Sequence, residues 1–206
     1  PGAGEVRLRQ VTNYPWDGSI RFEILSSPGN WALKLRIPAW CRSASLLLNG
    51  KAIDAELTPG TYAAIDRKWS DGDTLELELA MEPVLIQAHP LVEENHGKVC
   101  VKRGSVVYCL ESPELPADVA MDDVVLPVDA EITARYDESF FEGATLLDID
   151  TLVVDKLGRN DSLYHELERE SVRTQRLTFI PYYLWANRGV TEMSVWLPVT
   201  VGNGRR

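Results

Sequence analysis

The sequence predicts an all-β protein made of two tandem antiparallel β-sandwich domains. Short segments alternate apolar and polar residues with a period of two, which is typical of strands with one buried face. Turn residues separate these segments at intervals of about 8 to 12 residues, as in β-sandwiches. Helical periodicity is weak throughout, and the best candidate for a short helix is residues 162–169.

The first half of the chain carries the clearest strand patterns. Residues 31–37 are apolar at odd positions and mostly polar at even ones. Asn49-Gly50 is a strong hairpin signal, because a type I′ turn needs positive φ at both central residues. Residues 74–79 alternate Leu and Glu after a turn at residues 71–73, which predicts a half-solvated antiparallel strand. A calcium loop at residues 71–73 would need further oxygen ligands, so we interpret them as a hairpin turn.

The second half begins where the strand pattern loosens. Residues 83–97 contain two prolines, two histidines and a polar run, so we place the domain boundary there and expect domains at residues 1–90 and 91–206. The β-like segments that follow are residues 99–110, 124–128, 130–136, 146–154, 171–180 and 190–197.

Composition excludes several classes of protein. The 206 residues are 45% hydrophobic and 25% charged, as in ordinary globular proteins. A formal net charge of -10 would repel a phosphate backbone, so we expect no nucleic-acid partner. No apolar run reaches the roughly 18 residues of a membrane span and no signal peptide is visible, so we expect no membrane insertion and a cytoplasmic location. Because the first residue is Pro1, we expect the chain to be part of a longer protein.

The chain has three cysteines, which are Cys41, Cys100 and Cys109. A disulfide scaffold needs more cysteines and an even number of them, so none is predicted. If residues 103–106 form a two-residue hairpin turn, Cys100 and Cys109 lie opposite each other with Cα atoms about 4.5 Å apart, which is within disulfide range. Buried free thiols are the favoured interpretation, because cysteine packs as a small hydrophobic residue. A disulfide between Cys100 and Cys109 is the alternative.

No set of residues predicts a catalytic or metal site. A glycosidase needs two carboxylates across a cleft, and the sequence offers no way to pair its carboxylates. His89, His96 and His165 are dispersed, so a histidine zinc site is not predicted. Nucleophile-elbow, phosphate-loop and Cys-x-x-Cys motifs are absent from the sequence. The carboxylates considered and set aside are Asp17, Asp66, Asp71, Asp73, Glu111 and Asp148.

Six tryptophans raise the question of sugar binding, because sugar rings stack on exposed aromatic faces. Trp31 shares a strand face with apolar residues and Trp69 is placed to close one end of a sandwich, so both are expected in the core. Four others are candidates for a sugar site or for a domain interface, and we favour the interface because large aromatic residues bury one domain against another. These four are Trp16, Trp40, Trp185 and Trp196.

A series of motifs resembles glycoside hydrolase family 127, the β-L-arabinofuranosidase family. Their order and spacing cover nearly the whole chain. One departure is Ser105, where the family pattern has proline. The motifs are residues 11–18, 35–41, 67–69 with 72–73, 97–99, 103–111, 180–189 and 193–196.

The resemblance implies a parent enzyme with an (α/α)6 catalytic barrel followed by two β-sandwich domains, which are the part matched here. In that family the nucleophile is a zinc-bound cysteine and the acid/base is a glutamate, both in the barrel upstream. None of those roles carries over to Cys41 or Cys109, which lack the adjacent cysteine of the zinc site. Zinc is therefore expected only in the catalytic domain.

Three hypotheses follow for function. The leading one is a non-catalytic C-terminal region of a glycoside hydrolase that acts on β-L-arabinofuranosides or a related glycoside. This region would pack against the upstream barrel, with a homodimer as a further candidate assembly. The alternatives are an independent carbohydrate-binding module and a free-standing enzyme that uses carboxylates whose pairing the sequence does not reveal. A β-sandwich hosts many functions, so the fold alone supports none of them.

Overall fold

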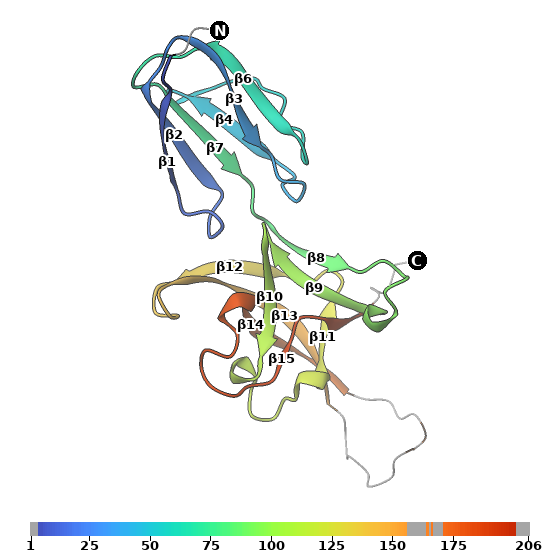
Figure 1. Cartoon of the computed structure of the whole chain (residues 1–206). Helices are drawn as coiled ribbons and strands as arrows, with labels where there is room; N and C mark the ends of the chain where they lie inside the picture. Colours follow the sequence, from blue (N-terminus) through green and yellow to red (C-terminus); the bar gives the residue numbers. More distant parts are fainter. Residues whose placement is uncertain (1–3, 156–163, 165, 167–170, 201–206) are drawn as a thin grey trace. The chain divides into compact units, whose positions relative to one another are not determined.

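A computed structural model describes residues 4–155, 164, 166 and 171–200. The chain divides into two compact units, Pro1–Glu82 and Pro83–Arg206 (Figure 1). Residues 83–90, which we expected in the first domain, belong to the second unit. The reason is that strand β8 (Pro83–Gln87) pairs along its whole length with β9 (Lys98–Arg103).

The prediction of an all-β protein is confirmed. Within the described residues the helical elements are short 3-10 turns, and none of them is long or apolar enough to cross a membrane. The predicted helix at residues 162–169 lies outside the described residues, apart from Tyr164 and Glu166. The 3-10 turns are η1 (Glu93–Asn95), η2 (Ser112–Glu114), η3 (Met121–Asp123) and η4 (Tyr182–Leu184).

The first unit consists of two antiparallel sheets. The larger has the strand order β1-β2-β7-β4-β5, and the smaller pairs β3 with β6. Alternate residues of both sheets, among them Leu35 of β3, Ile65 of β6 and Leu75 of β7, enter one hydrophobic core. The strands are β1 (Arg7–Thr12), β2 (Ser19–Ser26), β3 (Asn30–Arg36), β4 (Ala44–Leu48), β5 (Lys51–Ala52), β6 (Tyr62–Lys68) and β7 (Thr74–Leu79).

Two predicted turns of this unit are joined by hydrogen bonds. Asn49 and Gly50 have φ of 49° and 75°, as the predicted type I′ turn requires. Asn49 Nδ2 donates to Asp73 Oδ1 at 2.9 Å, and the Ser70 N–H donates to Asp73 Oδ2 at 2.9 Å. These bonds hold the pKa of the Asp73 carboxyl below its usual value. Asp73 therefore acts as a turn acceptor that ties the β6–β7 connection to the β4–β5 hairpin.

The prediction that Trp69 lies in the core is confirmed. Its side chain is 1% exposed, and its ring centroid lies 5.4 Å from that of Trp31. The indole Nε1–H donates to the Trp31 carbonyl oxygen at 3.0 Å, so the one polar atom of the ring is satisfied. Trp31 is half-buried and packs against the same core.

The described part of the second unit contains nine strands, and six of them close into a barrel. In order around the ring these are β9, β10, β14, β13, β11 and β16, and β16 returns to β9. The nine strands are β8 and β9 as given above, β10 (Val106–Glu111), β11 (Val124–Pro127), β12 (Ile132–Asp137), β13 (Ala144–Asp155), β14 (Ser171–Pro181), β15 (Met193–Ser194) and β16 (Leu197–Thr200).

Barrel closure departs from the antiparallel sandwich that we expected for this domain. Strand β9 changes partner along one edge: residues 101–103 pair with β10, whereas residues 98–99 pair with β16. In addition, β11 pairs with β16 in parallel, with Leu126 opposite Val199. The predicted strand at residues 190–197 is also interrupted, because residues 193–194 pair with β10 and the chain then enters β16.

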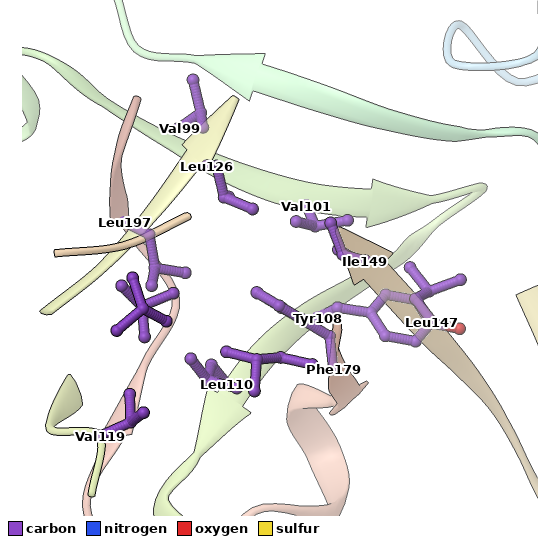
Figure 2. Packing of buried hydrophobic residues seen from close by; sticks show 13 residues of the cluster. Val99, Val101, Tyr108, Leu110, Val119, Leu126, Leu147, Ile149, Phe179 and Leu197 are labelled. Atoms are coloured by element: carbon purple, nitrogen blue, oxygen red, sulfur yellow. The ribbon is translucent and has the colours of Figure 1, made fainter. Parts of the chain in front are cut away.

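Large apolar side chains fill the barrel interior (Figure 2). Val101 and Tyr108 from the β9–β10 hairpin meet Leu147 and Ile149 of β13 and Phe179 of β14. The buried Tyr108 hydroxyl donates to the Thr145 carbonyl oxygen at 3.0 Å, and burial raises the pKa of Tyr108 to about 12. The interior is therefore a packed core.

The predicted β9–β10 hairpin is present. Arg103 lies opposite Val106, and Gly104 takes the positive φ of 58° that the turn needs. Ser105 has no positive φ, so this position of the turn does not require glycine. Beyond the hairpin the two strands diverge, and Cys109 pairs with β14 while Cys100 pairs with β8. Both cysteines, like Cys41, are buried free thiols, which confirms the favoured interpretation.

We predict that all three thiols are nearly inert in the native chain. Burial raises the pKa of Cys100, and raises that of Cys109 to about 12, so only about one Cys109 in 10⁴ is ionised at pH 8. Titration with dithionitrobenzoate should show slow reaction in buffer and three thiols in urea. A titre of Cys41 alone in urea would show instead that Cys100 and Cys109 are bonded.

Candidate functional site: an aromatic surface on the second unit

The four candidate tryptophans have different environments. Trp16 and Trp40 belong to the first unit, and Trp185 and Trp196 belong to the second. Trp16 is 47% exposed and Trp185 is 38% exposed, whereas Trp40 and Trp196 are half-buried. Part of each ring of Trp16 and Trp185 is accessible to solvent, so these two residues remain candidates for binding.

In the first unit, Trp40 has a packing role. Its ring stacks on Tyr14, with centroids 6.4 Å apart and planes at 10°, and both residues pack against the core. Trp16 follows the cis Tyr14–Pro15 peptide in a turn, where its backbone N–H donates to the Asn13 carbonyl oxygen at 2.8 Å. The structure therefore offers one exposed tryptophan at this site and not a pair.

In the second unit, Trp185 lies in a segment that leaves the end of β14 and crosses to β15. We call residues 182–190 the flap. The Trp185 and Tyr182 rings stack, with centroids 6.2 Å apart and planes at 15°. Tyr182, Tyr183 and Val190 are all exposed. The flap thus presents several large apolar side chains to solvent.

The tip of the β12–β13 hairpin contributes to the same region. Phe140 and Phe141 contact edge to face with centroids 5.0 Å apart, and the Arg188 guanidinium of the flap lies 5.0 Å above the Phe140 ring. This contact joins the flap to the hairpin tip. We define the aromatic surface as the exposed residues Phe141, Tyr182, Tyr183, Trp185 and Val190.

A small second core lies beneath the flap. Cys109, Ala144, Leu146 and Ile180 are buried together on strands β10, β13 and β14. Adjacent residues of the same strands point into the barrel, so this second core lies on the outer face of the sheet. The residues that cover it from the flap, the hairpin tip and the segment around β15 are Phe140, Leu184, Met193 and Val195.

A buried carboxylate fixes the flap to β10. Glu111, at the end of β10, is 0% exposed. Its Oε1 accepts hydrogen bonds from the Ala186 N–H at 3.1 Å and from the Thr191 hydroxyl at 2.6 Å, and its Oε2 pairs with Arg188. Ala186 has φ of 63°, which is uncommon for a residue with a Cβ. Glu111 therefore holds the flap at Ala186 and Arg188, and holds the residue just after it at Thr191.

The electrostatics of this cluster keep Glu111 ionised at neutral pH. Burial raises the pKa of its carboxyl, and the hydrogen bonds from Thr191, Arg188 and the Ala186 N–H lower that pKa. Together the hydrogen bonds outweigh burial, so the pKa of Glu111 lies below the usual value. Arg188 also pairs with Glu114 of η2, so one guanidinium bridges two carboxylates. Buried charges of this kind are stable only when all are partnered.

The sequence singled out Glu111 and Trp185 but not their partners. Glu111 was set aside as a carboxylate bound by solvent or a backbone amide, and the structure supplies the Ala186 amide together with Thr191 and Arg188. No signal in the sequence marks these partners, which meet Glu111 because β10 pairs with β15 and places residue 111 opposite residue 193.

The remaining candidates are dispersed. His89 Nδ1 accepts from the Leu91 N–H at 3.2 Å, and His96 bonds the Pro90 carbonyl oxygen through Nε2, while His165 lies outside the described residues. Across the described residues, no three His, Cys, Asp or Glu side chains are grouped so that they could hold a metal ion.

The other candidate carboxylates have local roles. Asp17 accepts from the Ser19 N–H, and Asp71 accepts from the Ser27 N–H. Asp148 accepts from Arg135 and Thr178, and Asp66 is exposed.

Comparison with known proteins covers both units. Residues 2–81 match the family model described as "Beta-L-arabinofuranosidase, GH127 middle domain", and residues 83–198 match "Glycoside hydrolase family 127 C-terminal domain". A non-reducing end β-L-arabinofuranosidase of Bifidobacterium longum subsp. longum is 32% identical over 207 residues, which is 94% of this chain and 30% of the relative.

Two solved structures are similar over nearly the whole chain. A GH127 β-L-arabinofuranosidase from Geobacillus stearothermophilus T6 has a TM-score of 0.86 and 38% identity, covering 95% of this chain and 31% of that one. A protein titled glycoside hydrolase has a TM-score of 0.88 and 35% identity, covering 96% and 33%. The chain therefore spans about a third of the length of these relatives.

Proposed function

Because the chain belongs to glycoside hydrolase family 127 and comprises its middle and C-terminal domains, we propose that it is the non-catalytic accessory region of a larger glycoside hydrolase. The observation that supports this proposal is coverage: two accessory-domain models account for nearly all of the chain, which matches about a third of its relatives. The catalytic residues then belong to the part of the parent polypeptide that lies upstream of these domains.

For the parent we propose hydrolysis of β-L-arabinofuranosides or a closely related glycoside. Two relatives at 32% and 38% identity are named for that activity. Zinc, which the family resemblance implies, is proposed for the upstream domain, and we assign no residue of this chain to it because the described residues contain no suitable group of ligands. Homodimerisation of the parent remains a prediction.

The test compares two proteins on an aryl β-L-arabinofuranoside. We expect the 206-residue chain to release no aryl alcohol above the buffer rate, and the complete parent to accelerate release by about 10⁶-fold or more, as enzymes generally do. Metal chelation should abolish the activity of the parent and leave the short chain unchanged. Turnover by the short chain would contradict the non-catalytic role. If neither protein hydrolyses this substrate but the parent hydrolyses another aryl glycoside, only the proposed sugar specificity of the parent would change.

A carbohydrate-binding module is the second candidate, favoured by the exposed rings of Trp16 and Trp185. Sugar recognition combines an aromatic face with polar groups that reach the hydroxyls. Beneath the aromatic surface, however, Glu111 is fully buried with both oxygens bonded, and Asn187 Nδ2 donates to the Leu184 carbonyl oxygen at 3.1 Å. Calorimetric titration of the short chain with arabino-oligosaccharides should give no heat of binding, and saturable heat lost in Trp185→Ala would support the module instead.

A further inference from the structure

We propose that the aromatic surface of the second unit is the docking site for the upstream catalytic region of the same polypeptide. This inference rests on the proposed function and adds the surface through which the accessory region meets its partner. The surface consists of Phe141, Tyr182, Tyr183, Trp185 and Val190.

The chemistry of the surface fits a protein partner. Tyr, Trp and Phe are the residues most enriched at the centre of protein interfaces, where a few of them carry most of the binding energy. Here two segments far apart in sequence supply them together: the β12–β13 hairpin tip gives Phe141 and the flap gives the others. The contact of Arg188 with Phe140 holds the two segments side by side.

The surface is also held in shape before any partner binds. Glu111 bonds the flap through the backbone of Ala186 and the side chain of Arg188, and bonds the Thr191 hydroxyl directly after the flap. The second core of Cys109, Ile180 and their neighbours supports the flap from below. A preformed surface loses little conformational freedom on binding, so more of the contact energy is retained as affinity.

The length of the relatives is the reason for proposing this occupant. The chain accounts for 30% of one arabinofuranosidase and 31% of another, so about two thirds of such a polypeptide lies outside the region matched here. A partner in the same polypeptide has an effective concentration in the millimolar range or above, so a surface of a few aromatic side chains is sufficient for stable contact.

Hydroxyl-radical footprinting of wild-type protein tests the proposal. Tyr182, Tyr183 and Trp185 should be oxidised readily in the 206-residue chain, and on the order of fivefold more slowly in the complete parent, because a contact surface excludes water from its central side chains. Tyr62, which is exposed on the first unit, is the internal control together with a soluble dose standard. Equal oxidation rates of the three flap residues in both proteins would overturn the proposal.

Two further footprinting measurements test for other occupants of the aromatic surface, which are a second copy of the chain and a sugar. Protection of the flap in the short chain that increases with its concentration would assign the surface to a second copy, and protection that appears only with arabino-oligosaccharide would assign it to sugar. Either result overturns the proposal. Hydrolysis of an aryl arabinofuranoside is measured on the same sample of the parent protein. If the parent is active and its flap is not protected, the docking proposal is refuted and the proposed reaction is not. If the flap is protected and the parent is inactive on every glycoside, the proposed reaction is refuted and the docking proposal is not.

A paired variant gives an independent measurement. Trp185→Ser combined with Tyr182→Ser removes two rings that stack on each other and are about half exposed, so the thermal midpoint of the short chain should fall by a small amount. In the complete parent the same pair should lower the midpoint by a larger amount, whereas Tyr62→Ser should lower it equally in the two proteins. An equal loss in both proteins would mean that the two rings support the fold and not an interface.

Discussion

Replacing Glu111 with alanine is expected to lower the free energy of unfolding of the second unit by about 3 kcal/mol, at the low end of the range for breaking a buried ion pair. The substitution leaves Arg188 without its buried partner and leaves the Ala186 N–H and the Thr191 hydroxyl without an acceptor. The low end applies because the Arg188 side chain is 27% exposed and keeps its bond to Glu114.

Urea unfolding followed by tryptophan fluorescence measures this loss. Glu114→Gln is the matched control, because Glu114 shares Arg188 and is 17% exposed, and because glutamine keeps an oxygen that can accept from Arg188 we expect it to cost about 1 kcal/mol. The triple variant Glu111→Ala, Arg188→Met and Glu114→Gln should recover part of the loss, since it removes all three charges of the cluster. Equal losses for Glu111→Ala and Glu114→Gln would show that the buried carboxylate has no special role.

The same network makes a prediction about pH. Because the pKa of Glu111 is lower in the folded chain than in the unfolded chain, its contribution to stability is fully present above the unfolded value of about 4.3 and is lost as pH falls through the folded value. The difference in stability between wild type and Glu111→Gln should therefore shrink below about pH 4.3. Asp73 and Asp137 also have lowered pKa values, but they contribute equally to both proteins and cancel in the difference.

Local patterns in the sequence predicted the individual strands well. The alternation of Leu and Glu in residues 74–79 gives β7, and Asn49-Gly50 gives the hairpin between β4 and β5. Barrel closure in the second unit could not be read in this way, because it depends on which distant strands pair. The exchange of partners along β9 and the parallel pairing of β11 with β16 leave no mark on the period-two pattern of either strand.

The candidate site shows the same division between local and distant information. Trp185 could be chosen from its residue type and its position at the end of a strand. The pair of Glu111 and Arg188 could not, because 77 residues separate them and each is an ordinary charged residue in its own segment. The domain boundary was placed late for a related reason: the assignment of β8 to the second unit follows from its pairing with β9 and not from its composition.

Trp69→Ala is expected to destabilise the first unit by about 3–5 kcal/mol, the range for removing a large buried aromatic side chain. The substitution opens a cavity against Trp31 and removes the indole N–H that satisfies the Trp31 carbonyl oxygen. The Arg67 guanidinium, which lies 5.2 Å from the Trp69 ring, loses its cation–π partner as well. Trp16→Ala is the control for the loss of an indole ring: because Trp16 is 47% exposed it gives up less buried apolar area, and it should cost about 1 kcal/mol.

The buried cysteines can report on each unit separately in this experiment. Cys41 lies in the core of the first unit, whereas Cys109 lies beneath the flap of the second. Pulsed alkylation along a urea gradient should label Cys41 of Trp69→Ala at a lower urea concentration than Cys41 of wild type, with the midpoint for Cys109 unchanged. Glu111→Ala should do the reverse and expose Cys109 first. If both cysteines shift together in either variant, the two units unfold as one cooperative structure, and the losses assigned to each unit must be treated as losses of the whole chain.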